Sequence, residues 1–247
     1  MGIQVVLPKV KSEIDNRWIK QKTVIIGAPG CGKSTFPSFG DKTLYLQCEA
    51  GLNHLSVMKT PVTSWDEWEA TYTALMQAKI KGDLPYDTIV IDTIDKFVDA
   101  VNNQAIEIGR NKYKGTEINT IADIPNGAGW GWATDLVENS LSKLEKLDCH
   151  IIVIGHLDRK EVKSPNGTSV HLQTISIGGK TGRAIMAWAD HLLNIETKMV
   201  GNTMQRVCRT IPTVSVEAKS RGGVIKDGWV WSSNDKENYD KFRSVFK

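Results

Sequence analysis

Short apolar runs alternate along the chain with longer stretches in which apolar residues recur every three or four positions. The clearest runs span residues 23–27, 43–49, 86–95 and 150–156. The run 23–27 is apolar without alternation, which is typical of a strand buried on both faces of a sheet. Strands that alternate with helical segments predict an α/β fold, with a mainly parallel central sheet and helices flanking it.

The helical stretches carry start signals and apolar stripes. Ser64 and Glu67 have the spacing of a capping box, in which each side chain bonds to a backbone N–H of the other residue. The helix that follows places four residues on one stripe, which we expect in the core: Trp65, Trp68, Tyr72 and Leu75. We expect further helices after residue 95, at 133–147 and at 183–192.

Two polar, glycine-punctuated stretches, 109–131 and 157–182, have no clear period and are predicted to be long loops. Strand-like stretches near the end of the chain, at 192–200, 205–211 and 228–231, predict a C-terminal β extension. The length of 247 residues suits one domain. We expect residues 1–20 to form an N-terminal arm or lead-in strand and residues 21–247 to form a single domain.

Charge and cysteine usage limit the class of protein. The net charge of +3 gives no global attraction for a polyanion, so any nucleic-acid binding depends on local patches. The four cysteines stand far apart with no histidine at zinc-site spacing, which indicates buried thiols, a reducing cytoplasm and no structural metal. We expect a cytoplasmic protein with no membrane contact, because no apolar run approaches the ~20 residues of a membrane span.

Residues 27–34, GAPGCGKS, match the phosphate-binding P-loop pattern between a strand and a helix start. Gly27, Gly30 and Gly32 allow the backbone N–H groups to face a phosphate. Lys33 supplies a charge, and the Ser34 hydroxyl suits Mg²⁺. The alternative is a glycine-rich turn with a surface lysine. The predicted ATP-binding set is Gly27, Ala28, Pro29, Gly30, Cys31, Gly32, Lys33, Ser34 and Thr35.

Acidic and polar residues end the other predicted strands. Asp92 has the form of the Walker B acid that holds Mg²⁺, and Asp95 is a weaker candidate. Glu49 is placed to orient the attacking water, because the carboxyl ends of parallel strands surround the ligand crevice. His156 is placed to sense the γ-phosphate. The alternatives are a helix cap for Asp92, a loop carboxylate for Glu49 and a hydrogen-bonded strand-end histidine for His156.

The order of these parts resembles the RecA-like ATPases over roughly residues 20–230. LYLQCEAGL (44–52) looks like the strand that ends in the catalytic glutamate, and VIGH (153–156) stands where that family carries its γ-phosphate sensor. GRAIMAWADHLLNIE (182–196) resembles the helix and strand after the second DNA-binding loop. The resemblance therefore implies a RecA-like P-loop NTPase core with ATP and Mg²⁺ as cofactors.

AKSRGG (218–223) looks like an element that reaches the neighbouring subunit's ATP in hexameric helicases and RecA relatives. The resemblance makes Lys219 and Arg221 candidate catalytic fingers acting in trans, whereas the alternative is a solvated basic turn. It also implies a homo-oligomer, as a ring or short filament.

The closest resemblance is to the RecA-like branch of the phage Sak single-strand annealing proteins. They share the short connection between P-loop and second strand, in which Pro37 limits the first helix to a turn or two.

In RecA-like proteins the loops after the Walker B helix and after the sensor strand bind single-stranded DNA. The first corresponding stretch here combines cations with aromatic residues, as sequence-tolerant strand binding requires, and the second carries cations. The candidates are Arg110, Lys112, Tyr113, Lys114, Trp130 and Trp132 in the first, and Arg159, Lys160, Lys163, Lys180 and Arg183 in the second. The alternatives are that the tryptophans staple the next helix and that the basic residues are solvated.

These features predict an ATP-dependent, single-stranded-DNA-binding recombination protein that anneals or pairs strands, with a single-strand-binding protein as a further partner. Two alternatives remain open. One is a helicase-like ring motor, which would share every nucleotide-binding residue. The other is a P-loop regulator that binds a protein partner.

Overall fold

A computed structural model describes residues 7–163, 166–226 and 228–247. Its centre is a sheet, and from edge to edge the order is β10 (Trp229–Val230), β8 (Thr203–Arg209), β7 (His191–Val200), β1 (Lys22–Gly27), β5 (His150–Lys163), β4 (Thr88–Asp92), β2 (Thr43–Gln47) and β3 (Met58–Pro61). The strands from β7 to β3 pair in parallel, whereas β8 and β10 are antiparallel. The predicted α/β class with a mainly parallel sheet and a C-terminal β extension is confirmed.

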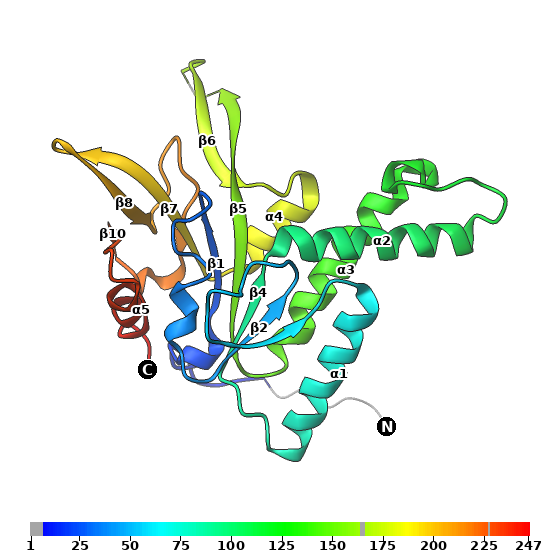
Figure 1. Ribbon diagram of the computed structural model, residues 1–247, viewed down its shortest axis with the longest axis horizontal. Helices are drawn as coiled ribbons and strands as arrows, with labels where there is room; N and C mark the ends of the chain where they lie inside the picture. Colours follow the sequence, from blue (N-terminus) through cyan, green and yellow to red (C-terminus); the bar gives the residue numbers. More distant parts are fainter. Residues whose placement is uncertain (1–6, 164–165, 227) are drawn as a thin grey trace.

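Two more strands branch from this sheet. β6 (Ser169–Ile175) forms an antiparallel hairpin with the outer half of β5, and this hairpin projects from the top of the molecule in Figure 1. β9 (Lys219–Ser220) pairs with the start of β7.

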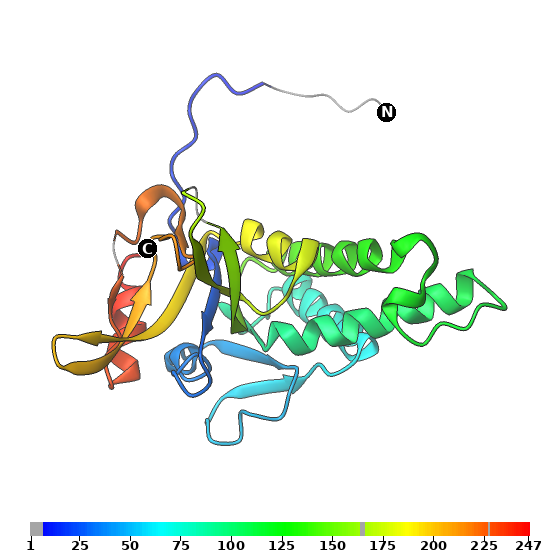
Figure 2. The same cartoon turned by 90° about the horizontal axis from the view of Figure 1, so that it is seen from above.

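The helices form unequal layers on the two faces of the sheet. Helices α1 (Trp65–Lys81), α2 (Ile94–Lys112), α3 (Ala128–Glu145) and α4 (Gly179–Trp188) cover one face, and α5 (Asp235–Arg243) lies on the other. Figure 1 shows α1, α2 and α3 to the right of the sheet and α5 to its left, and Figure 2 shows α2, α3 and α4 side by side.

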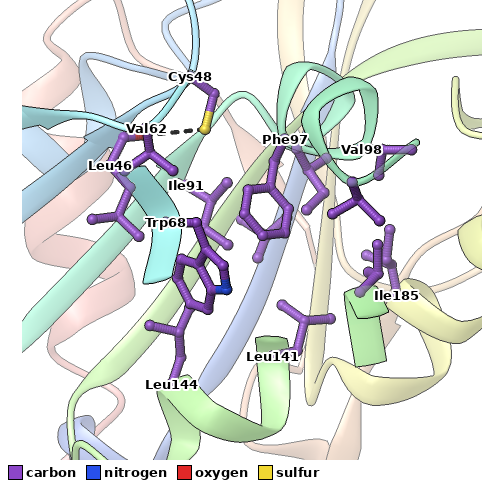
Figure 3. Close-up of a cluster of buried hydrophobic side chains, with 14 of the residues drawn as sticks. Leu46, Cys48, Val62, Trp68, Ile91, Phe97, Val98, Leu141, Leu144 and Ile185 are labelled. Atoms are coloured by element: carbon purple, nitrogen blue, oxygen red, sulfur yellow. Dashed lines mark hydrogen bonds between the residues drawn. The ribbon is translucent and has the colours of Figure 1, made fainter. Parts of the chain in front are cut away.

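Alternate residues of the inner strands enter opposite layers, which explains why these strands are apolar without a break. On β4, Ile89 and Ile91 face the larger cluster, whereas Val90 faces the smaller one, and all three are fully buried. Figure 3 shows the larger cluster, where Trp68 of α1 meets Phe97 of α2 with ring centroids 5.3 Å apart. Burial of these rings supplies much of the hydrophobic stabilisation of this layer.

Helix α1 begins at the predicted cap, with one difference. The Ser64 hydroxyl accepts a hydrogen bond from the Glu67 N–H at 3.3 Å. The Glu67 carboxylate reaches past Ser64 and accepts from the Thr63 N–H at 2.6 Å and from the Thr63 hydroxyl. These bonds hold the pKa of Glu67 below its ordinary value and fix the entry to the helix.

The predicted loop 109–131 is confirmed only in its middle, since residues 113–127 connect two helices through two short 3₁₀ turns, whereas both of its ends are helical. Helix α2 continues to Lys112, and α3 already begins at Ala128, so Trp130 and Trp132 are helical residues. Gly129, one of the glycines that suggested a loop, has a packing role: a Cβ on it would lie 2.7 Å from the Ile121 carbonyl oxygen. Close contact of this kind needs a glycine inside the helix.

The prediction of a loop over 157–182 is wrong. Residues 157–163 and 169–175 form the β5–β6 hairpin, and α4 starts at Gly179. Arg159, Lys160 and Lys163 therefore extend from a strand, where successive side chains point to opposite faces. The polar composition reflects a hairpin with two mostly solvated faces.

The P-loop is followed by a short 3₁₀ turn, Phe36–Phe39, in place of an α-helix. Pro37 has no N–H to donate to the Lys33 carbonyl, and its ring would clash with that carbonyl in an α-helix. The predicted shortening of this helix is thus confirmed. β3 and α5 were not predicted, because β3 has only four residues and α5 is strongly polar.

The start of the chain was predicted to be an arm or lead-in strand. The described residues 7–16 form no strand and are almost all exposed. Trp18 is buried, and its indole N–H donates to the Thr88 hydroxyl at 2.8 Å. The division into an arm at 1–20 and one domain at 21–247 stays a prediction, and residues 1–6 lie outside the described residues.

All four cysteines are buried and carry free thiols, as their apolar surroundings predict. In the part of the chain that the structure describes, no helix is both long and apolar enough to cross a membrane. Over the same residues, no three His, Cys, Asp or Glu side chains gather in a way that could hold a metal ion.

We expect Trp68→Ala to lower the free energy of unfolding by about 3–5 kcal/mol, because it leaves a large cavity in the core. Trp68→Phe should cost less, since the indole N–H of Trp68 is buried without a hydrogen-bond partner among the described residues. Urea unfolding measures both. Trp130→Ala is the control, because Trp130 is 56% exposed. Equal losses for Trp68→Ala and Trp130→Ala would contradict this account of the core.

Candidate functional site

The P-loop has the backbone geometry that its glycines predict. Gly30 and Gly32 adopt φ values of 74° and 92°, in the left-handed region that favours glycine. Gly27 ends β1, where a Cβ would lie 2.7 Å from the Cys31 sulfur and 2.9 Å from the Ile195 carbonyl oxygen. A side chain at any of the three positions would strain the loop, so the loop depends on all three glycines.

Lys33 is held inside this loop. Its side-chain ammonium donates to the carbonyl oxygens of Gly27 and Ala28, both at 2.9 Å, and the residue is 7% exposed. These two bonds fix the position of the ammonium beside the loop. Its charge favours a phosphate group at this position.

Residues far along the sequence support the P-loop. The Tyr45 hydroxyl of β2 donates to the Ser34 carbonyl at 2.7 Å, and the Arg206 guanidinium of β8 donates to the Cys31 carbonyl at 2.9 Å. The Asp235 carboxylate lies beside Gly32, close enough that a Cβ on Gly32 would meet it at 3.0 Å. No local pattern marks these residues as loop supports, so sequence analysis missed them.

Asp92 ends β4 next to the P-loop and is 4% exposed. Burial raises the pKa of its carboxyl group, while a hydrogen bond from the Ser34 side chain opposes that shift. Among the described residues, its Oδ2 atom has no hydrogen-bond partner. An orphaned buried carboxylate oxygen beside a serine hydroxyl fits the oxygen ligands that Mg²⁺ prefers, held directly or through water.

Glu49 lies at the same edge of the sheet. The Cys48 N–H donates to the Asp92 carbonyl at 2.8 Å, so the chain after β2 runs beside the end of β4. The Glu49 carboxylate accepts from the Thr93 hydroxyl at 3.3 Å, and its charge adds to the raised pKa of Asp92. Asp92 is joined to Thr93 by a cis peptide bond. The predicted pair of acids is thus brought together.

His156 stands opposite Gly27 in the register of β1 and β5. Its backbone N–H donates to Asp95 Oδ2 at 2.9 Å, and its ring Nδ1 lies 3.2 Å from the same oxygen. The other Asp95 oxygen accepts from the Ser176 hydroxyl. Asp95, the weaker Mg²⁺ candidate, therefore contacts the sensor residue and the segment before α4.

Lys219 and Arg221 lie at the opposite end of the sheet, since Lys219 pairs with Leu192 near the start of β7. The Lys219 ammonium donates to three carbonyls at the end of α4, at 2.5–3.2 Å, and burial lowers its pKa. Arg221 forms an ion pair with Asp190 at 2.7 Å. These residues are remote from this chain's own P-loop, so their predicted role at a neighbour's ATP stays a prediction.

Several of the first group of DNA-binding candidates contact one another or nearby residues. Lys112 lies over the Trp132 ring, 4.9 Å from its centroid, and Tyr113 stacks on that ring. Arg110 donates to the Ile118 carbonyl at 2.8 Å and to Glu107. Trp132 thus joins the ends of α2 and α3. Lys114, on the connection after α2, is exposed.

The second group is divided between two elements. Arg159 and Lys163 are exposed on the β5–β6 hairpin, with Lys160 half-buried on its other face. Lys180 and Arg183 are exposed on the first turns of α4. One candidate from each group, Trp130 and Lys180, lines the same cleft, whose volume is 640 Å³. That cleft is where the structure brings the two predicted groups together.

Comparisons with known proteins find a matching family and a curated relative. The AAA domain family AAA_24 matches residues 19–222. A curated relative, the SPbeta prophage-derived uncharacterized protein YorG of Bacillus subtilis (strain 168), is 27% identical over 172 residues. The matched region is 68% of this chain and 50% of the relative, so the chain spans about half the length of that protein.

The raised pKa of Asp92 gives a prediction for Asp92→Asn. Because the folded state binds this proton more tightly than the unfolded state, the ionised carboxylate costs stability above the folded-state pKa. That cost vanishes below the ordinary value of 3.8. At pH 7 without Mg²⁺, Asp92→Asn should therefore unfold at a higher temperature than the wild type.

The same variant should lose the extra thermal stability that Mg²⁺ adds to the ATP-bound protein. Asp135→Asn, an exposed carboxylate on α3, is the control and should change neither temperature. A lower melting temperature for Asp92→Asn at pH 7 would show that burial is not the dominant influence on this carboxylate.

Proposed function

Because the chain belongs to the AAA domain family of P-loop ATPases, we propose that it hydrolyses ATP with Mg²⁺ and couples this reaction to single-stranded DNA. In this proposal it is a phage-type recombination protein that anneals or pairs strands as an oligomer. The prophage origin of the relative supports the phage context. The observation that carries the ATPase part is the convergence of Lys33, Asp92, Glu49 and His156 at one edge of the sheet.

Each residue has a defined part in this proposal. The N–H groups of the P-loop and the Lys33 ammonium bind the phosphates, and Ser34 and Asp92 hold Mg²⁺. Glu49 accepts a proton from the attacking water, since it is a partly exposed carboxylate beside Asp92. Mg²⁺ would neutralise charge on the phosphates while these groups position them.

The DNA part rests on exposed cations and one exposed aromatic ring. Arg159 and Lys163 project from the hairpin, while Trp130 and Lys180 share a cleft. Cations that meet phosphates and rings that stack on bases bind single strands with little sequence preference. The packing of Trp132 against Tyr113 and Lys112 makes that ring a weaker candidate than Trp130.

We expect single-stranded DNA to raise ATP turnover by the wild-type protein. Lys33→Ala should reduce turnover to background with or without DNA, because it removes the charge that binds the phosphates. Lys42→Ala, an exposed lysine just before β2, is the matched control and should keep turnover within about twofold of wild type. Release of phosphate from ATP, with and without an oligonucleotide, measures all three proteins.

Strand annealing and duplex unwinding, measured in parallel, separate recombination from a ring motor. Unwinding without annealing would favour the motor. ATP turnover that does not change when DNA is added, together with no retention of the strand in a gel shift, would overturn the DNA part of the proposal. That result would favour a regulator that binds a protein partner. A fully active Lys33→Ala would overturn the site itself.

Arg221→Ala should lose turnover alone and regain it when mixed with Lys33→Ala, if Arg221 acts on a neighbouring subunit's ATP. In the mixture, one variant supplies the intact P-loop and the other the intact arginine. Arg17→Ala is the matched control, because Arg17 also forms an exposed ion pair, with Asp15 at 2.6 Å. No recovery in the mixture, with both variants folded by circular dichroism, would count against a role in trans.

A further inference from the structure

A cleft of 640 Å³ lies between α2, α3 and the start of α4. Its volume is within the range of small-molecule sites, roughly 300–1,000 Å³. Trp130 of α3 forms one wall and is 56% exposed, which is unusual for the largest apolar side chain. Lys180 at the start of α4 is exposed at the same cleft.

The cleft combines groups that suit a nucleotide unit with two carboxylates, those of Asp95 and Asp99, and Asp99 is ion-paired with Lys96 at 2.9 Å. The open indole face of Trp130 suits a planar base, and the Lys180 ammonium suits the phosphate that follows it. Gly178 and Gly179 leave the backbone of the α4 start open, since a Cβ on either would have nothing within 4 Å. A base could therefore lie against this segment without a steric barrier.

One carboxylate, that of Asp95, lies both in the wall of the cleft and beside His156 at the edge of the sheet that carries the P-loop. Asp95 and Ser176 both line the cleft. Asp95 Oδ2 accepts from the His156 N–H and lies 3.2 Å from the His156 ring, while Oδ1 accepts from the Ser176 hydroxyl. The Ser176 N–H also donates to the His156 carbonyl at 3.0 Å. His156 and Ser176 thus contact each other directly and through Asp95.

We propose that this cleft binds one nucleotide of single-stranded DNA, with the base on Trp130 and the phosphate on Lys180, and that Asp95 makes its affinity depend on ATP. The inference rests on the proposed function and adds the place of contact and its regulation.

Asp95 is a positioning residue in this account. A displacement of His156 by the γ-phosphate moves the carboxylate that also holds Ser176. Ser176 stands four residues before Lys180, so the displacement reaches the phosphate-binding side of the cleft. A ligand shifts such an equilibrium only if its contacts differ between the two arrangements, and the shared carboxylate supplies that difference.

The first test measures the anisotropy of a labelled oligothymidylate titrated with the full-length protein. Trp130→Ala should weaken binding about tenfold, while Trp130→Phe, which keeps a ring face, should stay within about threefold of wild type. An oligouridylate and free thymidine monophosphate distinguish the sources of the same base–phosphate unit. We expect the DNA oligomer to compete best.

The second test adds Mg²⁺ and a non-hydrolysable ATP analogue and compares DNA affinity with and without it. Wild type should show a change of about fivefold or more. Asp95→Asn and Ser176→Ala should each reduce the ratio of DNA affinities with and without the analogue to within about twofold, whatever their DNA affinity without nucleotide. Asp135→Asn, on the exposed face of α3, is the matched control and should keep the full change.

The outcomes separate the inference from the proposed function. If wild type does not bind the oligonucleotide, the proposed DNA role fails and the inference with it. If wild type binds and Trp130→Ala binds equally well, the cleft is not the contact, although the DNA role stands. If Asp95→Asn and Ser176→Ala, both folded by thermal unfolding, keep the full nucleotide response, the coupling through Asp95 is wrong.

Discussion

The register of the parallel strands is the constraint on which the rest of the site depends. β5 lies between β1 and β4, with His156 opposite Gly27 and Ile154 opposite Asp92. His156 therefore stands two residues past the level of Asp92, between the P-loop strand and the acidic strand end. A shift of β5 by one residue would turn this side chain to the other face and remove it from the edge. The position of the predicted sensor is a product of sheet geometry more than of local sequence.

Contacts in the smaller layer hold the P-loop in position, because the segment after it forms only a short 3₁₀ turn. A long helix there would add a macrodipole that favours phosphate, but Pro37 ends the segment after one 3₁₀ turn. Phe36 in that turn packs against Trp231, Tyr239 and Phe242 from the C-terminal segment. The loop is therefore positioned by tertiary contacts, and the charge that meets the phosphate comes mainly from Lys33 and from the N–H groups of the loop.

Much of this architecture could be predicted from the sequence. The inner strands are apolar on both faces, and few other residues can take the place of the P-loop glycines. Prediction was wrong where glycine has a packing role. Gly129 lies inside α3 because the chain at Ile121 approaches it closely, and that contact is invisible without the fold. The hairpin was missed because both of its faces are mostly polar, so alternation gave no contrast.

The residues of the candidate site also divide into those that the sequence could predict and those that it could not. Lys33 and Asp92 follow local patterns that link residue type to position on a strand. The link between Asp95 and Ser176 joins residues 81 positions apart and needs the β5–β6 hairpin to bring the second residue back. No periodicity encodes such a contact. Trp130 could be proposed from composition, but its separation from Trp132 required the direction of each ring on the helix.

The thiol of Cys31 gives the nucleotide loop a particular chemical character. It lies in the P-loop and carries a sulfur that the neighbouring ammonium would be expected to activate. Burial nevertheless raises the pKa of Cys31, and this influence outweighs the nearby charge of Lys33. Because the thiolate is the form that reacts with oxidants and alkylating agents, burial disfavours the reactive form of this cysteine inside the loop.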